Sequence, residues 1–146
     1  MQILGQIPTP EKYVNLMLNE VGYHEQLLGK TFIDNSCGDG NVLAEAVKRY
    51  IRASKKEGHT IESIKINLES DIWGYDVDKN AVSATLERLN KIAMQENIYG
   101  IKWNIQVSDY LETDVNKFDY IVGNPPYITY HDLTTEQREY LKHNFI

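Results

Sequence analysis

Four consecutive residues, Asn124-Pro125-Pro126-Tyr127, combine the side chains needed for chemistry on a planar amine. An adenine amine is a poor nucleophile because its lone pair is delocalised into the ring. Two acceptors that hold both N–H bonds favour the pyramidal nitrogen that can attack a methyl group in line. The Asn124 side-chain oxygen and the Pro125 carbonyl could be these acceptors. The prolines stiffen the loop, and Tyr127 offers an aromatic face for an extruded base. The alternative is a rigid turn with an exposed tyrosine.

A glycine turn, Gly38-Asp39-Gly40, matches the first two glycines of the dinucleotide-binding pattern, but Leu43 stands where the third would fall. Asp34 and Asp39 flank this turn, and two carboxylates would repel a pyrophosphate at the following helix N-terminus. S-adenosylmethionine carries a sulfonium and an ammonium and no phosphate, so the same carboxylates attract it. The charge pattern therefore predicts S-adenosylmethionine as the cofactor and disfavours NAD and ATP.

Two further aspartates follow predicted strands. Asp76 closes an apolar strand and could accept hydrogen bonds from ribose hydroxyls; alternatively, it caps the next helix together with Asp78. Asp109 could accept from the exocyclic amine of the cofactor's adenine, or it could bond its own backbone in a turn. Thr9 followed by Pro10 is typical of many helix starts and carries a weaker functional signal.

Strands and helices must alternate along the chain to bring these residues together. That rhythm predicts βαβ units, right-handed crossovers and an α/β, doubly wound, mainly parallel sheet, which binds ligands at the carboxyl ends of its strands. A polar insertion of unassigned structure at 55–70 explains why Asp76 lies farther from the glycine turn than the usual ~20 residues. The expected strands are 31–34, 72–76, 103–107 and 118–122, and the expected helices are 8–21, about 41–50, 79–95 and 135–142.

Composition sets the class of protein. A length of 146 residues, 42% hydrophobic and 25% charged, suits one ordinary globular domain. One cysteine and four scattered histidines predict neither an intrachain disulfide nor a zinc site. The net charge of −6 disfavours a mainly electrostatic nucleic-acid binder. No membrane-length apolar run or signal peptide is read, so a cytoplasmic location is expected.

The ordered series of motifs resembles the S-adenosylmethionine-dependent adenine-N6 DNA methyltransferases of restriction-modification systems. Gly5 to Pro10, with Thr9, is similar to the family's N-terminal Thr-Pro motif, which helps to bind the methionine end of the cofactor. The segment 34–40 resembles the cofactor loop, so the resemblance assigns Asp34, Cys37, Gly38 and Gly40 to cofactor binding. Asp76 and Asp109 fall at the ribose and adenine positions. Asn124, Pro125, Pro126 and Tyr127 fall at the catalytic tetrapeptide.

This resemblance implies a Rossmann-like class I methyltransferase fold that is incomplete. The family's sheet has about three further strands and is followed by a target-recognition domain. We therefore expect residues 1–146 to be the N-terminal part of a catalytic domain, present either as a fragment or as half of a split enzyme. The activity of this part by itself would then depend on whether it can complete the catalytic site alone. The expected partners are double-stranded DNA and the remaining part of the enzyme or a specificity subunit. An exposed sheet edge predicts self-association, and the absent recognition domain predicts weak, unselective DNA binding.

Other functions fit part of the pattern. The same tetrapeptide serves methyltransferases that act on protein glutamine or RNA guanine, although the Thr-Pro element favours DNA. A methyltransferase-like module that binds cofactor or a partner chain without catalysis is an alternative from another class. A dehydrogenase would have to bind NADH despite the acids that flank the turn.

Overall fold

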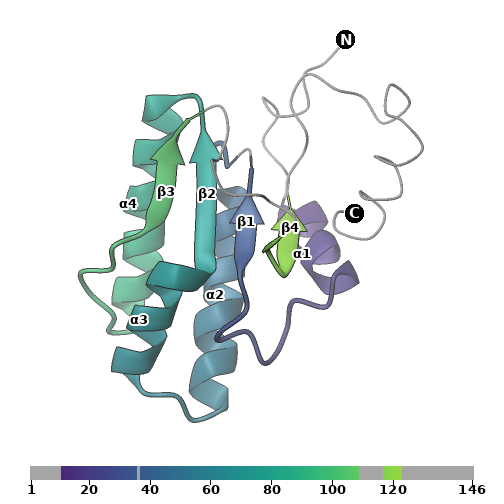
Figure 1. Ribbon diagram of the computed structural model, residues 1–146, viewed down its shortest axis with the longest axis vertical. Coiled ribbons are helices and arrows are strands. Elements are labelled where there is room, and N and C mark those ends of the chain that lie inside the picture. The colour runs from purple at the N-terminus through teal and green to yellow at the C-terminus, as the bar shows by residue number, and fades with distance from the viewer. Residues whose placement is uncertain (1–10, 36, 109–116, 123–146) are drawn as a thin grey trace.

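The computed structural model describes residues 11–35, 37–108 and 117–122, and its core is a parallel sheet (Figure 1). Within these residues the sheet has four strands in the order β3-β2-β1-β4, and every neighbouring pair is parallel. The predicted α/β fold with a parallel sheet is confirmed, as one part of a Rossmann-like fold. The strands are β1 (Phe32–Asp34), β2 (Ile72–Asp76), β3 (Asn104–Val107) and β4 (Tyr120–Val122).

Helices join the strands in the way that parallel pairing requires. Figure 1 shows α2 and α4 side by side behind the strands, α3 running into the amino end of β2, and α1 beyond β4. The long helices confirm two predicted crossovers, and α1 confirms the described part of the helix expected at 8–21. Residues 8–10 and the helix expected at 135–142 lie outside the described residues. The helices are α1 (Glu11–Glu20), α2 (Asn41–Lys56), α3 (Ile61–Asp71) and α4 (Lys79–Gln95).

The order of the strands creates a switch point between β1 and β4. The chain moves outward from β1 to β2 and then to β3, and it returns across the sheet to place β4 on the other side of β1. The strand order therefore reverses at β1. In open α/β sheets, ligands bind in the crevice at the carboxyl ends of the strands where the strand order reverses.

Side chains alternate between two faces of the sheet, as the period of a strand demands. Phe32, Ile72 and Ile105 belong to the large core beneath the helices, whereas Ile33 and Ile121 belong to a second cluster with Phe118. Phe32 and Ile72 are completely buried, and each such side chain contributes roughly 1.5–3 kcal/mol to folding. The sheet is therefore held mainly by the face that α2 and α4 cover.

Residues 55–70, to which the sequence analysis assigns no structure, include the end of α2 and most of α3. Thr60 begins α3, because its side chain accepts a hydrogen bond from the Ser63 N–H at 3.1 Å. Ile64 and Leu68 are buried one turn apart, whereas Ile66 is 65% exposed. The exposed isoleucine obscures the helical period, so the sequence alone does not identify this polar insertion as a helix.

The amino ends of β1 and β4 are fastened to each other by a reciprocal pair. The Asp119 carboxylate accepts from the Thr31 N–H at 2.9 Å, and the Asp119 N–H donates to the Thr31 hydroxyl at 3.0 Å. In the part of the chain that the structure describes, no helix combines the length and the apolar character needed to cross a membrane.

Candidate cofactor site at the carboxyl ends of the strands

The glycine turn lies directly between β1 and α2. The Gly40 N–H donates to the Cys37 carbonyl at 2.8 Å, and the Gly40 carbonyl then accepts from Ala44 at 2.7 Å, which starts the helix. Gly38 and Gly40 have φ values of 52° and 89°. Both lie in the left-handed region that glycine adopts without a steric cost. The two glycines singled out in the sequence are therefore required by the backbone of this turn.

Asp76 joins the end of β2 to that turn. One carboxylate oxygen accepts from the Gly38 N–H at 2.9 Å, and the other accepts from the Asp78 N–H, also at 2.9 Å. A second tie runs from the Cys37 N–H to the Tyr75 carbonyl at 3.1 Å. The structure thus brings together Cys37, Gly38 and Asp76, which the sequence placed in one site.

The alternative reading of Asp76 as a helix cap is answered by its neighbour. Asp78 is the N-cap of α4, and its side chain accepts from the Asn80 N–H at 2.8 Å and from the Ala81 N–H at 3.4 Å. Asp76 accepts from the N–H of this N-cap residue with one oxygen and from the glycine turn with the other, so it contacts both the start of α4 and the turn. Since a carboxylate offers about four acceptor positions, each Asp76 oxygen keeps capacity for a hydroxyl donor.

The site is rich in carboxylates and has a neutral thiol at its centre. Asp34 is 1% exposed at the end of β1, and Cys37 is 4% exposed. Burial raises the pKa of the Cys37 thiol to about 12, with further contributions from the negative charges of Asp34 and Asp76. Cys37 is therefore a packed side chain that is protonated at neutral pH.

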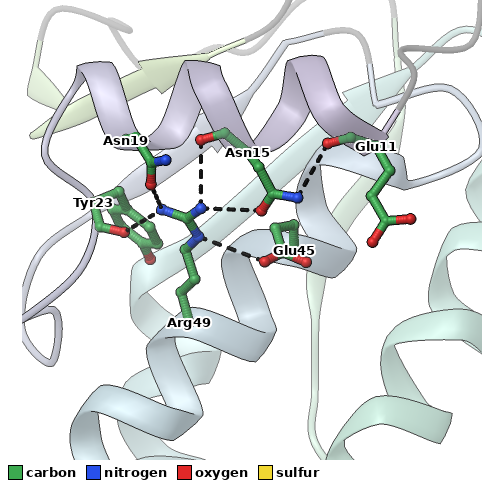
Figure 2. Close-up of polar contacts among 6 residues, drawn as sticks. All are labelled: Glu11, Asn15, Asn19, Tyr23, Glu45 and Arg49. Atoms are coloured by element: carbon green, nitrogen blue, oxygen red, sulfur yellow. Dashed lines mark hydrogen bonds and ion pairs between the residues drawn. The ribbon is translucent and has the colours of Figure 1, made fainter.

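α1, which follows the Thr9-Pro10 segment, is attached to α2 by one guanidinium (Figure 2). Arg49 donates to the side-chain oxygen of Asn19 at 2.8 Å and to that of Asn15 at 3.0 Å. It also donates to the Tyr23 carbonyl at 3.2 Å and lies 3.5 Å from a Glu45 oxygen. These contacts fix the start of the described chain against the helix that the glycine turn begins.

Two residues near the turn were missed by the sequence analysis. Thr85 of α4 is completely buried, and its hydroxyl donates to the Gly38 carbonyl at 3.1 Å. A hydroxyl on the apolar face of a predicted helix was the signal that could have found it. Val77 follows Asp76 and is 62% exposed, so it adds an apolar side chain to the surface at the end of β2. A valine that immediately follows a strand-end aspartate was the available signal there.

The remaining predicted residues lie outside the described ranges, although the structure fixes their neighbours. Thr9 and Asn124 to Tyr127 are not described, and neither is Asp109. Ser108, which precedes Asp109, donates its N–H to the Asp76 carbonyl at 2.9 Å. Val122 pairs with Asp34 in the register of β4 with β1. The roles expected for the undescribed residues stay predictions.

Comparison with known proteins identifies the relatives of this site. Residues 30–146 match the family described as Eco57I restriction-modification methylase. The chain is 30% identical over 141 residues to the Type II methyltransferase M.BstVI of Geobacillus stearothermophilus, which covers 85% of this chain and 24% of that protein. The chain therefore spans about a quarter of the length of this curated relative.

Solved structures with the same arrangement of elements come from restriction-modification enzymes. The M protein of the Type I restriction enzyme EcoKI gives a TM-score of 0.62 at 14% identity, covering 84% of this chain and 26% of that one. The ATP-dependent Type ISP enzyme LlaBIII bound to DNA gives a TM-score of 0.58 at 12% identity, covering 88% and 10%. At these identities the likeness establishes the fold alone.

Proposed function

The chain belongs to the family of Eco57I restriction-modification methylases, and from this premise we propose that it is the cofactor-binding and catalytic front part of an adenine-N6 DNA methyltransferase. The methyl donor in this proposal is S-adenosylmethionine. The observation that carries it is the bond from the Gly38 N–H to Asp76, which joins the turn after β1 to the end of β2 beside the switch point.

The chemistry of the donor set fits this cofactor. Asp76 retains acceptor capacity at the edge of the sheet, as two ribose hydroxyls require. Asp34 precedes the glycine turn and Asp39 lies within it, where they would attract an ammonium and repel a diphosphate. In the proposal, Cys37, Gly38 and Gly40 form the wall of the cofactor loop, Thr9 helps to hold the methionine end, and Asp109 accepts from the adenine amine.

Bound S-adenosylmethionine supplies a methyl group made electrophilic by its sulfonium. The acceptor of that methyl group would be the adenine N6 amine, and the proton displaced from this amine would pass to solvent water. The Asn124 side-chain oxygen and the Pro125 carbonyl accept hydrogen bonds from the two N–H groups of the amine. These bonds orient its lone pair. Pro126 stiffens the loop, and Tyr127 stacks on the base.

Double-stranded DNA is the proposed substrate. The solved relative LlaBIII is bound to DNA, and the family is one of restriction-modification methylases. With a net charge of −6, this chain is not expected to hold the phosphate backbone tightly by itself. Partner segments with more Lys and Arg would then supply most of the DNA affinity.

Calorimetric titration with S-adenosylmethionine and with its demethylated product tests the cofactor half of the proposal. We expect both to bind, and we expect Asp76→Ala to weaken binding about tenfold or more because hydrogen bonds to the ribose are lost. Asp119→Ala is the matched control: it also removes a carboxylate that accepts a backbone N–H, but at the amino end of the sheet. Equal affinity for Asp76→Ala and wild type would contradict the assignment of the ribose site.

Mass spectrometry of the methylated product tests the substrate half. The expected product on double-stranded DNA is N6-methyladenine, and Asn124→Ala should abolish its formation while leaving cofactor affinity unchanged. Methylglutamine in protein or methylguanine in RNA would replace the proposal by a related methyltransferase activity. Cofactor binding together with the same low turnover in wild type and Asn124→Ala would indicate a binding module.

A further inference from the structure

Gly38 is held by two side chains from different elements. Its N–H donates to Asp76 at the end of β2 at 2.9 Å, and its carbonyl accepts from the Thr85 hydroxyl of α4 at 3.1 Å. Thr85 is completely buried, whereas Asp76 is partly exposed at the carboxyl end of β2. The aspartate therefore holds the turn from the site, and the threonine holds it from the core.

The bond to Thr85 fixes the orientation of a peptide unit. The peptide bonds of the described residues are all trans, so the N–H of Asp39 points opposite to the Gly38 carbonyl. Because Thr85 holds this carbonyl toward α4, it directs the Asp39 N–H away from the helix. Gly38 is a glycine with a φ of 52°, so it has no Cβ that would restrict the rotation of this peptide. The Thr85 hydroxyl supplies the restraint instead.

Thr85 also lies against the second glycine of the turn. A Cβ placed on Gly40 would lie 3.0 Å from the Thr85 hydroxyl oxygen and 3.2 Å from its methyl carbon. The same side chain therefore contacts the turn at two positions. A threonine satisfies both needs, since its hydroxyl bonds the Gly38 carbonyl while its methyl fills the space beside Gly40.

We propose that Thr85 is a positioning residue for the cofactor, whose hydroxyl holds the glycine turn in the conformation that binds S-adenosylmethionine. The proposal rests on the proposed function and adds a determinant of affinity that lies in the core behind the site. Thr85 does not touch the cofactor. It acts through Gly38, whose N–H and carbonyl are both engaged.

Two substitutions separate the hydroxyl from the rest of the side chain. Thr85→Val keeps the branched shape and removes the donor, whereas Thr85→Ser keeps the donor and removes the methyl. By calorimetry, we expect Thr85→Val to weaken S-adenosylmethionine binding about tenfold, since the Gly38 carbonyl loses its partner. Thr85→Ser should bind within about threefold of wild type, a rescue that loss of packing alone would not produce.

A control separates affinity from stability. Leu89, one turn farther along α4, is also completely buried, and Leu89→Val should lower the free energy of unfolding without changing the dissociation constant. Urea unfolding of each variant gives the folded fraction that enters every titration. If Thr85→Val does not fold, the comparison of Thr85→Ser with Thr85→Ala isolates the same hydroxyl.

The outcomes distinguish this proposal from the one on which it rests. If wild type binds S-adenosylmethionine and Thr85→Val binds it equally well, the role of Thr85 is overturned and the proposed function stands. If the folded wild type does not bind, both are overturned. If Thr85→Val and Thr85→Ser lose affinity equally, the shape of the side chain and not its hydroxyl determines the conformation of the turn. That result also overturns the proposal.

Discussion

The Tyr50 hydroxyl donates a hydrogen bond of 2.5 Å to the Asp71 carboxylate, inside the core where α2 faces the end of α3. The same carboxylate oxygen accepts from the Gly29 N–H at 2.7 Å, and Asp71 is 4% exposed. A single buried oxygen thus joins α2, α3 and the loop before β1. These two donors compensate a carboxylate that would otherwise be costly to bury.

Asp71 should make stability fall as pH rises. Burial raises its pKa above the ordinary 3.8, although the hydrogen bonds from Tyr50 and Gly29 oppose the shift. The folded chain therefore binds this proton more tightly than the unfolded chain does. Its contribution to the free energy of unfolding is full below about pH 4 and is lost as the pH rises through the raised pKa. Urea unfolding of wild type and Asp71→Asn, with the difference plotted against pH, measures the effect. A difference that stays flat or rises with pH would refute it.

Gly40→Ala should destabilise the chain more than Gly58→Ala. The two glycines have nearly equal φ values of 89° and 88°, so alanine meets the same backbone strain, roughly 1–2 kcal/mol, at both positions. A Cβ at Gly58 has no atom within 4 Å, whereas a Cβ at Gly40 meets Thr85. Gly40→Ala should therefore lose about 1 kcal/mol or more of unfolding free energy beyond the loss in Gly58→Ala, because of the steric clash with Thr85. Chemical denaturation measures both variants, and equal losses would contradict the predicted contact.

Arg49→Ala should loosen α1 from α2. The substitution removes the hydrogen bonds to Asn15, Asn19 and the Tyr23 carbonyl, at a cost of about 1–3 kcal/mol. Hydrogen exchange should accelerate across α1 and much less in α4. Arg52 is exposed on the same helix, and Arg52→Ala should change stability by less than about 0.5 kcal/mol. Unchanged exchange in α1 after Arg49→Ala would show that apolar packing alone holds the helix.

Cys37 should react slowly with thiol reagents in the folded chain. Its pKa of about 12 leaves roughly one thiolate in ten thousand at pH 8, and its side chain is buried. Because it is the single cysteine, absorbance with a chromogenic disulfide reports on this position alone. In urea, the reaction of the Cys37 thiol should be complete before the folded protein has reacted to a measurable extent. Rapid labelling of folded protein would mean that the turn opens readily.

The strands were predictable because their signals are local. β1 and β2 each join an apolar run to a terminal aspartate, and Ile72 to Asp76 has the predicted bounds. α3 was not predictable in this way, because Ile66 points to solvent and breaks the apolar period. A helix with only two buried apolar residues, Ile64 and Leu68, gives little contrast between its faces.

The candidate site was predictable in its membership more than in its contacts. Asp76 was expected beside the glycine turn because the carboxyl ends of parallel strands lie on the same side of a sheet. That its carboxylate would accept from Gly38 depends on the angle at which the turn leaves β1, which no local pattern encodes. Thr85 was hidden because it occupies the same helical stripe as the buried Val82 and Leu89, where a threonine packs almost like a valine.

The reciprocal pair between Thr31 and Asp119 sets an order of assembly on the ribosome. These partners lie 88 positions apart, so β4 cannot dock until nearly all of the described chain has been synthesised. β1, β2 and β3 with their two crossover helices are complete by Val107, and domains generally form from the N-terminus during synthesis. We therefore expect the nascent chain to acquire the bond between Gly38 and Asp76 before β4 arrives.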